Sequence, residues 1–597
     1  RKEWVRLFAI DEIKGDLTTE AYSEPLTMEF LRQNPFLVLD TAFFDARFKH
    51  KLLKRMENVD EQTNGLLINS ENFQALNLLQ EKFRQRVKCI YIDPPYNTGN
   101  DGFVYKDSFK HSSWLSFLFD RIGSSYNLIK EDGLIFSSIS DQEEEKIKLL
   151  FDCIFGENNF EGHIHWRRRH NQPNDKTKML GLVAEHIFSY AKNSERYKNS
   201  GVGKIEITGK FTNPDNDPKG PWASKPWKVG SDQSGSRYKI KGPNGKEYDE
   251  EWMGEEKTYW DLLKEGRIYF PKGGDGMPRK KYYKFERAEE GQCATNWWTH
   301  EQFGHNQGAS DMLAKMMGYK NSFSNPKPIE LIKSIYQIAN VKTNDFVLDY
   351  FLGSGTSIHS SIFLQRCFND NVRYIGVEMN EYIHTVSKPR ILKAIHSSSW
   401  ENGKPLISDG ISQCFKYIRL EQYEDTLNNL QLKNQQTSMG SSGFNESYML
   451  CYMLDTETRD SLLNLKWFEN PFAMTLKATR DNELVDTPVD MVETFNFLIG
   501  LNVETEAWYK DDNICVVTGK THKDDLKTLV IWRNCKEIDN DTLNNFFDRM
   551  DFRTRDTEFD VIYVNGDNTL PNLKRNDENW KVVLIEEEFT KRMFTED

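Results

Sequence analysis

The stretch that decides the fold is Cys89-Ile90-Tyr91-Ile92-Asp93-Pro94-Pro95-Tyr96-Asn97-Thr98-Gly99. Its short run of apolar, mostly β-branched and aromatic residues ends at two prolines, which is typical of a buried strand that stops at a stiff turn. Each proline fixes its own φ angle and disfavours helical backbone in the residue before it. We therefore expect Asp93 and Tyr96 on a rigid turn at the carboxyl end of a strand, where open α/β sheets bind their ligands.

Strand and helix patterns alternate on both sides of this turn. Before the insert, the pattern predicts strands at 66–69, 87–92, 133–141, 163–166 and 186–191, and helices at 71–79, 114–122 and 143–155. It resumes near 325, with helices at 328–336 and 357–367 and strands at 345–349 and 373–378. The first strand–helix–strand predicts a parallel βαβ unit with a right-handed crossover. The whole pattern predicts an α/β, doubly wound fold around a mixed sheet.

The chain's length and composition predict two to four domains in a cytoplasmic protein. Of its 597 residues, 38% are hydrophobic, and no apolar run is long enough for a transmembrane span or a signal peptide. The chain begins with Arg1, so we expect its natural start to be missing. The eight cysteines form no close pair, and no Cys/His spacing suits zinc, so we expect reduced thiols and no metal site. The net charge of −13 argues against a nucleic-acid partner, although local patches decide such binding.

Changes in composition divide the chain into five parts. We expect an N-terminal helical arm at 1–60, a two-part α/β domain at 61–193 and 311–400 with an insert at 194–310, and a C-terminal α+β domain at 401–597. The insert is polar and dense in tryptophan. Basic residues in and just before it are interleaved with aromatic ones, which favours DNA contact but is also typical of a solvated face: Arg167, Arg168, Arg169, Arg279, Lys280 and Lys281. The C-terminal domain carries no chemical motif, is divided by a polar stretch at 434–443 that we expect to be mobile, and is expected to serve interaction or assembly.

A second motif follows the strand at 345–349. The loop Gly353-Ser354-Gly355 precedes a helix, and Glu378 ends the next strand. The glycines let the backbone approach a ligand closely, and the acidic side chain can accept both ribose hydroxyls. The loop lacks the third glycine of dinucleotide-binding proteins and has no Gly-Lys-Ser/Thr. S-adenosylmethionine fits best, because it needs a ribose contact and a close glycine loop but no pyrophosphate cradle.

The Asp93–Tyr96 turn suits methyl transfer to an exocyclic amine. Such a transfer requires acceptors for the amine hydrogens, so that the nitrogen lone pair turns toward the methyl carbon. The Asp93 carboxylate and the Pro94 carbonyl can be those acceptors, and Tyr96 offers a flat face for an extruded base. Attack by nitrogen needs no cysteine nucleophile, and no Pro-Cys pair suited to cytosine C5 methylation is present.

These two motifs resemble those of the amino-methylating DNA methyltransferases, which pair Asp/Ser/Asn-Pro-Pro-Tyr/Phe/Trp with Phe-x-Gly-x-Gly. The catalytic motif precedes the cofactor loop, as in the beta class, where the insert is the target recognition domain. Within that class, the chain most resembles the modification (Mod) subunit of type III restriction–modification systems. The stretches that carry this resemblance are 91–99, Gly266-Arg267-Ile268-Tyr269-Phe270-Pro271, 351–356, 415–417, 423–425, 427–429, 492–496 and Val564-Asn565-Gly566-Asp567.

The resemblance implies a Rossmann-like methyltransferase sheet and a set of site residues. The catalytic motif would be Asp93, Pro94, Pro95 and Tyr96. The residues around the cofactor would be Glu71, Asp93, Lys327, Asp349, Phe351, Gly353, Ser354, Gly355, Thr356 and Glu378. Family members usually carry Asp where Glu71 stands, and a helix-start glutamate is the alternative for this residue. For Trp166, DNA contact and structural packing both stay open.

The expected function is S-adenosylmethionine-dependent methylation of adenine N6 in double-stranded DNA, with base flipping. As a type III subunit, the protein would form a homodimer and could recruit a helicase–nuclease restriction subunit. Cytosine N4 methylation is the alternative within the enzyme class. A DNA-binding or assembly subunit with a lapsed catalytic site is the alternative outside it. Protein or RNA methylation is less favoured, because the insert is long and the motif order matches the DNA enzymes.

Overall fold

The computed structural model describes residues 1–16, 18–97, 110–171, 179–207, 209–423, 425–426, 465–480, 483–555, 558–575 and 580–594. The polar stretch expected at 434–443 and the family-like stretch 427–429 lie outside these residues. Two compact units are present: Val202–Thr295 is one, and Arg1–Gly201 together with Asn296–Asp597 is the other. Among the described residues, none of the helices combines the length and apolar character needed to cross a membrane.

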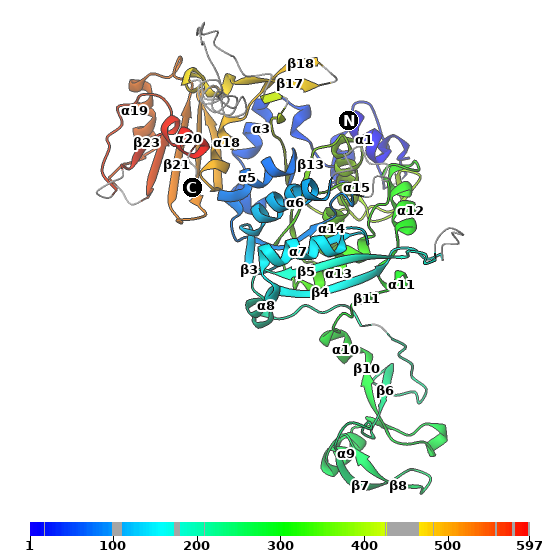
Figure 1. Ribbon diagram of the computed structural model, residues 1–597. Helices are drawn as coiled ribbons and strands as arrows, with labels where there is room; N and C mark the ends of the chain where they lie inside the picture. Colours follow the sequence, from blue (N-terminus) through cyan, green and yellow to red (C-terminus); the bar gives the residue numbers. More distant parts are fainter. Residues whose placement is uncertain are drawn as a thin grey trace. The chain divides into compact units, whose positions relative to one another are not determined.

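A nine-stranded sheet forms the centre of the larger unit (Figure 1). In spatial order its strands are β11 (Trp297–Trp298), β4 (Phe160–Arg167), β5 (Ala184–Ala191), β3 (Ile129–Ile139), β2 (Val87–Ile92), β12 (Phe346–Asp349), β13 (Arg373–Glu378), β1 (Gly65–Asn69) and β16 (Phe415–Arg419). The six strands from β3 to β16 run parallel, and β5 is antiparallel to both β3 and β4. The α/β class and the mixed sheet predicted from the sequence are confirmed.

Two groups of helices pack along the sheet (Figure 1). One group is α5 (Asn72–Phe83), α6 (His111–Tyr126) and α7 (Glu144–Phe155); the other is α13 (Ile329–Ile338), α14 (Thr356–Phe368) and α15 (Lys388–His396). Apolar residues at helical spacing form their buried faces, as in α5, where Ala75, Leu76, Leu79 and Phe83 lie in the core. The helices predicted in these regions are confirmed, with ends shifted by a few residues.

The strand order places late parts of the sequence between early ones. β12 and β13 lie between β2 and β1, so the strands of the predicted first βαβ unit are parallel but not adjacent. As a result, the turn after β2 lies beside the ends of β12 and β13. This is the edge of the sheet where the strand order reverses, the usual place for a ligand in such folds.

The parts expected to flank the sheet are joined closely to it. The N-terminal arm contains only short helices, including α1 (Lys2–Phe8) and α3 (Ala46–Leu53), and α1 packs on α15. β16 extends the central sheet beyond residue 400. A second, five-stranded sheet follows: β19 (Leu501–Tyr509), β20 (Ile514–Thr521), β21 (Lys527–Arg533), β22 (Val561–Val564) and β23 (Val582–Leu584), with helices α18 (Met491–Leu498), α19 (Asn540–Arg549) and α20 (Ile585–Phe594). The predicted α+β character of the C-terminal domain is confirmed.

The unit Val202–Thr295 contains two small sheets. Strands β6 (Trp222–Pro226), β10 (Arg279–Tyr283) and β9 (Ile268–Tyr269) form one; β7 (Ser236–Lys241) and β8 (Glu247–Trp252) form the other. Trp227 and Trp252 belong to its core, so part of its tryptophan content serves packing. The unit is shorter than the insert expected at 194–310, because α8 (Ser194–Ser200) packs on β3 and α12 (Asn306–Met317) packs on α15.

Candidate active site

The Asp93–Tyr96 turn follows β2 directly and is held by side chains from the neighbouring helices. Trp114, fully buried on α6, donates from Nε1 to the carbonyl of Pro95 at 2.9 Å. Asn97 donates to Oε1 of Glu143, just before α7, at 2.8 Å. The stiff turn that the sequence predicts at the carboxyl end of this strand is therefore confirmed.

Asp93 lies at the centre of a hydrogen-bonded cluster. The hydroxyl of Tyr96 donates to Asp93 Oδ1 at 2.6 Å, and Lys327 Nζ lies 2.9 Å from the same oxygen and 2.8 Å from Oδ2. Lys327 also donates to the Tyr96 hydroxyl at 2.9 Å and forms an ion pair with Glu185 at 2.9 Å. Lys327 was expected near the cofactor, and the structure places its ammonium on the Asp93 carboxylate.

One ammonium therefore serves two carboxylates in a buried site. Burial raises the pKa of Asp93; the charge of Lys327 opposes this rise and the charge of Glu185 adds to it. Burial acts to lower the pKa of Lys327, but the charges of Asp93 and Glu185 outweigh it and the pKa lies above its ordinary value. Burial, together with the charge of Asp93, raises the pKa of Tyr96 well above its ordinary value, so the phenol stays protonated and donates.

The loop after β12 is built around backbone positions that favour glycine. Gly353 and Gly355 have φ angles of 51° and 78°, in the left-handed region. A Cβ on Gly353 would lie 2.9 Å from the ring of Phe323. Gly353 N–H donates to Glu378 Oε2 at 2.9 Å, and Asn380 N–H donates to Oε1 at 2.9 Å. These two bonds fix the Glu378 carboxylate at the end of β13, beside the glycine loop.

A buried arginine connects this loop to Lys327. Arg390 Nη1 donates to Ser354 Oγ at 3.1 Å and to Thr356 Oγ1 at 2.8 Å. Thr356 Oγ1 in turn donates to the Lys327 carbonyl at 3.1 Å. Burial lowers the pKa of Arg390 to about 9. The glycine loop and the loop carrying Lys327 are thus held as one structure.

Asp349 ends β12, and Glu71 follows β1, two strands away in the sheet. Asp349 accepts from Phe351 N–H at 3.0 Å and has its pKa raised by burial to about 7. Glu71 caps α5 by accepting from Phe73 N–H at 2.7 Å and forms an ion pair with Arg121 at 2.5 Å. Glu71 therefore has the helix-start function considered as an alternative, while it also lines the cavity described next.

A cavity of about 200 Å³ brings the two motifs together. Of the residues expected in catalysis or cofactor binding, all but Gly355 line it: Glu71, Asp93, Pro94, Pro95, Tyr96, Lys327, Asp349, Phe351, Gly353, Ser354, Thr356 and Glu378. The cavity is also lined by four residues that were not predicted from the sequence: Glu185, Asn306, Phe323 and Tyr382. An acidic residue in a strand that is otherwise almost entirely buried was the available signal for Glu185.

Of the three arginines at the end of β4, Arg168 lines the cavity and the other two do not. Arg168 lines the cavity and lies 3.4 Å from Glu185, whereas Arg167 donates to the Arg169 carbonyl at 3.2 Å and is more exposed. Arg169 is exposed. Trp166 is fully buried and donates to the Gly304 carbonyl at 3.0 Å, so packing accounts for it.

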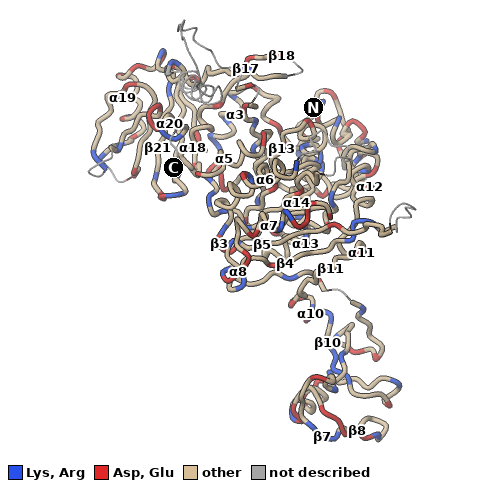
Figure 2. Tube along the Cα trace, in the orientation of Figure 1, with Lys and Arg blue, Asp and Glu red and all other residues tan. Residues whose placement is uncertain are grey.

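The basic residues of the insert differ from one another. Lys281 is 4% exposed, and its ammonium lies 2.5 Å from Asp215 and 2.6 Å from Asp217. These ion pairs neutralise the Lys281 charge within the insert, whereas the sequence predicted that Lys281 contacts DNA. Arg279 donates to Ser224 Oγ at 2.8 Å, and Lys280 lies 5.4 Å from the ring of Tyr282. Figure 2 shows these basic residues grouped along β10.

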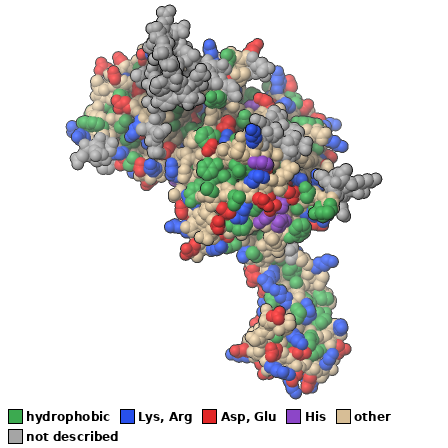
Figure 3. All heavy atoms as spheres, in the orientation of Figure 1, with side chains coloured by type: hydrophobic (Ala, Val, Ile, Leu, Met, Phe, Trp, Pro, Cys, Tyr) green, Lys and Arg blue, Asp and Glu red, His purple; other side chains and the backbone are tan. Residues whose placement is uncertain are grey.

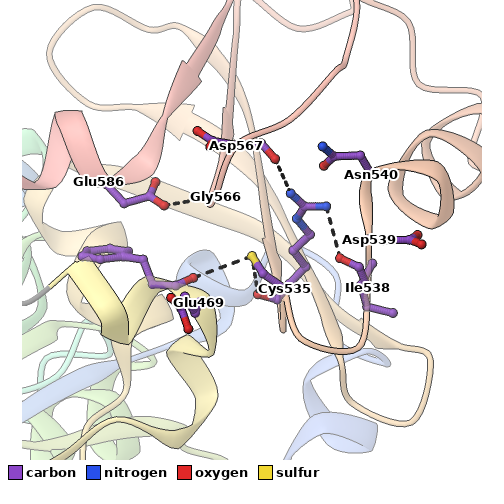
Figure 4. A pocket seen from close by; sticks show the side chains of 10 residues that line it. Glu469, Cys535, Ile538, Asp539, Asn540, Gly566, Asp567 and Glu586 are labelled. Carbon is purple, nitrogen blue, oxygen red and sulfur yellow. Dashed lines mark hydrogen bonds between the residues drawn. The ribbon is translucent and has the colours of Figure 1, made fainter.

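A second cavity, of about 340 Å³, lies in the C-terminal domain at the ends of β21 and β22 (Figure 4). Arg533, 2% exposed, donates to the carbonyl oxygens of Ile538 at 3.2 Å and Asp567 at 2.7 Å. Glu586 accepts from Gly566 N–H at 2.6 Å. These bonds fix the loops that follow the strands, so the polar groups of this cavity already have a structural use.

The chain is similar to known DNA-modifying proteins. It is 32% identical over 337 residues to the type III restriction–modification enzyme StyLTI Mod subunit of Salmonella typhimurium, covering 51% of this chain and 51% of that protein. It is 26% identical over 404 residues to the type II methyltransferase M.KpnI of Klebsiella pneumoniae, covering 61% and 90%. The chain thus spans about half the length of the first of these relatives.

A solved structure and a family model also match the chain. A putative DNA modification methylase from Thermus thermophilus aligns with 60% of this chain and 99% of its own, with 13% identity and a TM-score of 0.30. The model of the DNA methylase family matches residues 87–389, just over half of the chain. This segment contains the Asp93–Tyr96 turn, the glycine loop and Glu378. The chain belongs to the DNA methylase family.

Proposed function

We propose that the protein transfers a methyl group from S-adenosylmethionine to the N6 amine of adenine in double-stranded DNA. One observation carries this proposal: the Asp93–Tyr96 turn, the glycine loop at Gly353 and the side chain of Glu378 all line a single cavity. An acceptor for an amine and a holder for a ribose therefore lie together, as a methyl transfer between the two ligands requires. Membership in the DNA methylase family supports the choice of DNA.

The residues present fit S-adenosylmethionine, which supplies a methyl group bound to a positively charged sulfur. Glu378, which lines the cavity at the end of β13, would accept the ribose hydroxyls. Gly353 brings its backbone close to the cavity, where a Cβ would instead meet Phe323. Phe323, Phe351 and Tyr382 provide apolar walls for the adenine and the thioether carbons. No nucleotide triphosphate or dinucleotide motif competes with this assignment.

Asp93 and the Pro94 carbonyl would accept the two hydrogens of the target amine. In this structure, Asp93 already accepts from Tyr96 and Lys327, so the amine would join these bonds or take the place of one of them. Even if the Lys327 bond is replaced, Lys327 stays paired with Glu185, which keeps the ammonium satisfied. Tyr96 would stack on the flipped base. The raised pKa of Asp93 suits it to take the proton that the nitrogen loses as the new N–C bond forms.

We propose further that the protein is the modification and recognition subunit of a type III restriction–modification system. Its similarity to the StyLTI Mod subunit and to the probable HindVI Mod subunit of Haemophilus influenzae supports this. In this proposal the unit Val202–Thr295 recognises the target sequence. The C-terminal domain serves assembly: a homodimer and a contact with a helicase–nuclease subunit.

Tritium transfer from labelled S-adenosylmethionine to plasmid DNA, followed by mass spectrometry of the nucleosides, tests the activity. N6-methyladenine is the expected product. If N4-methylcytosine is formed instead, the target base is cytosine and the rest of the proposal stands. Absence of any methylated nucleoside, with cofactor binding intact by calorimetry, would instead support a DNA-binding or assembly subunit. Gly355→Asp, which should weaken cofactor binding in calorimetry, provides the matching negative control.

A further inference from the structure

Three histidines meet on one face of the central sheet. His163 and His165 are two residues apart on β4, so their side chains point to the same side. Strand pairing places His186 of β5 directly opposite His165. The three side chains have ring nitrogens that all lie within 4.8 Å of one another. In Figure 3, histidine side chains (purple) meet acidic ones (red) on the surface near these strands.

Two ring nitrogens of the cluster, His163 Nε2 and His186 Nδ1, face each other at hydrogen-bond distance. His186 Nε2 lies 3.0 Å from Asp141 Oδ1, which leaves His186 Nδ1 facing His163 Nε2 at 2.9 Å. A carboxylate on one imidazole nitrogen fixes the tautomer and frees the other nitrogen to bind a metal ion, a common arrangement at such sites. The ring of His165 lies 4.1 Å from that of His163, centroid to centroid.

A carboxylate from the neighbouring helix completes the group. Glu144, the first residue of α7, has Oε1 3.6 Å from His163 Nε2, on the side where the imidazole nitrogens meet, while its Oε2 lies 3.5 Å from His186 Nε2, the nitrogen that faces Asp141. Three imidazoles and one carboxylate form a nitrogen- and oxygen-rich set of four ligands. Zn²⁺ and related divalent transition metals prefer such sets, at metal–ligand distances of about 2.0–2.2 Å.

We propose that His163, His165, His186 and Glu144 form a binding site for a divalent transition metal of the zinc class, with Asp141 positioning His186. No metal site was expected from the sequence, because these histidines do not have the spacing of known zinc motifs; strand pairing brings them together. The site is independent of the proposed methyl transfer.

The ion would cross-link β4, β5 and the start of α7. His186 and Glu185 are consecutive on β5, so their side chains point to opposite faces of the sheet. Glu185 binds Lys327 on the face of the active site, and His186 belongs to the histidine cluster on the other. The ion would therefore steady the strand that carries Glu185 without contacting substrate.

The test uses the full chain with any affinity tag removed and metals stripped by a chelator. We expect calorimetric titration with ZnCl₂ to give one ion per chain, and CoCl₂ to give the intense visible absorption of a four-coordinate site. A weak six-coordinate cobalt spectrum, or no saturable binding of either metal, would overturn the proposal. These measurements need no variant, so they decide the matter even if substitutions impair folding.

Variants then assign the ligands. The double variant His163→Ala/His165→Ala should lose the site, and Asp141→Asn should weaken binding by about 10- to 100-fold, as for other residues that orient a metal ligand. His384→Ala, which removes an exposed histidine outside the cluster, is the matched control and should bind as the unchanged protein does. Undiminished binding in a folded double variant would place the ion elsewhere and refute the assignment.

Discussion

The Nζ atom of Lys327 lies 2.8 Å from Oδ2 of Asp93, and this ion pair joins the Asp93–Tyr96 turn to the loop that precedes α13. Lys327 also pairs with Glu185, so its single positive charge is shared between two carboxylates. Because Lys327 is nearly fully buried, water screens these interactions little. The protonation of Asp93 therefore depends strongly on Lys327.

We predict that Lys327→Met shifts the acid limb of the pH–rate profile to higher pH. Asp93 acts as an acceptor when ionised, so activity falls as the pH falls through its pKa. The charge of Lys327 lowers the pKa of Asp93, so removing this charge raises that pKa. Measurement of kcat/KM for methyl transfer against pH tests this, with Lys342→Met at an exposed position as the control.

The same variant leaves Asp93 without its cation and Glu185 with Arg168 alone, so its melting temperature must be recorded beside the kinetics. A folded Lys327→Met protein with an unshifted acid limb would show that Asp93 is not the group that titrates. A shift to lower pH would contradict the electrostatic argument itself.

We predict that Asp93→Ala lowers methyl transfer by about 10²–10⁴-fold while cofactor affinity stays largely unchanged. The variant removes the acceptor for the amine but leaves the Gly353–Glu378 contact untouched. Tritium transfer to DNA and calorimetry with S-adenosylmethionine measure the two effects separately. Full residual activity would remove Asp93 from the mechanism, and equal losses in both assays would indicate a disturbed fold.

Local sequence patterns predicted much of the sheet and both motifs of the site. Strand β2 and its proline turn follow from residues 87–96 alone, because β-branched residues and prolines act on their own backbone. Glu378 was found because a glycine loop and a strand-end carboxylate have a characteristic spacing. The residues of each motif follow one another at a fixed spacing in the sequence, so a local pattern was enough to predict them.

Residues that depend on tertiary packing were harder to predict. Lys327 was expected at the cofactor, yet its ammonium binds Asp93, because tertiary packing brings the loop before α13 to the turn after β2. Lys281 was expected to contact DNA, but it is enclosed by Asp215 and Asp217 from a distant loop. A side chain's burial and partners come from tertiary packing, which composition and spacing do not contain.

We predict that Gly353→Ala destabilises the protein and weakens cofactor binding. The residue has a φ of 51°, where a Cβ costs about 1–2 kcal/mol, and the new methyl would also meet the Phe323 ring at 2.9 Å. Gly123→Ala is the matched control: it lies within α6, its Cβ would meet nothing within 4 Å, and it should stabilise by up to about 1 kcal/mol. Denaturant unfolding and calorimetry measure both. Equal effects of the two variants would contradict the assigned loop geometry.

The last prediction separates two adjacent lysines of β10. Lys280 is partly exposed, so Lys280→Ala should leave stability unchanged, weaken DNA binding and reduce the dependence of log affinity on log salt by about 1. Lys281 is buried between two aspartates, so Lys281→Ala leaves their charges uncompensated and should destabilise the insert by about 3 kcal/mol. Fluorescence anisotropy with duplex DNA at several salt concentrations and thermal unfolding distinguish the two outcomes. If Lys281→Ala instead changed only the salt dependence, its charge would be available to DNA and the pairing with Asp215 and Asp217 would be dispensable.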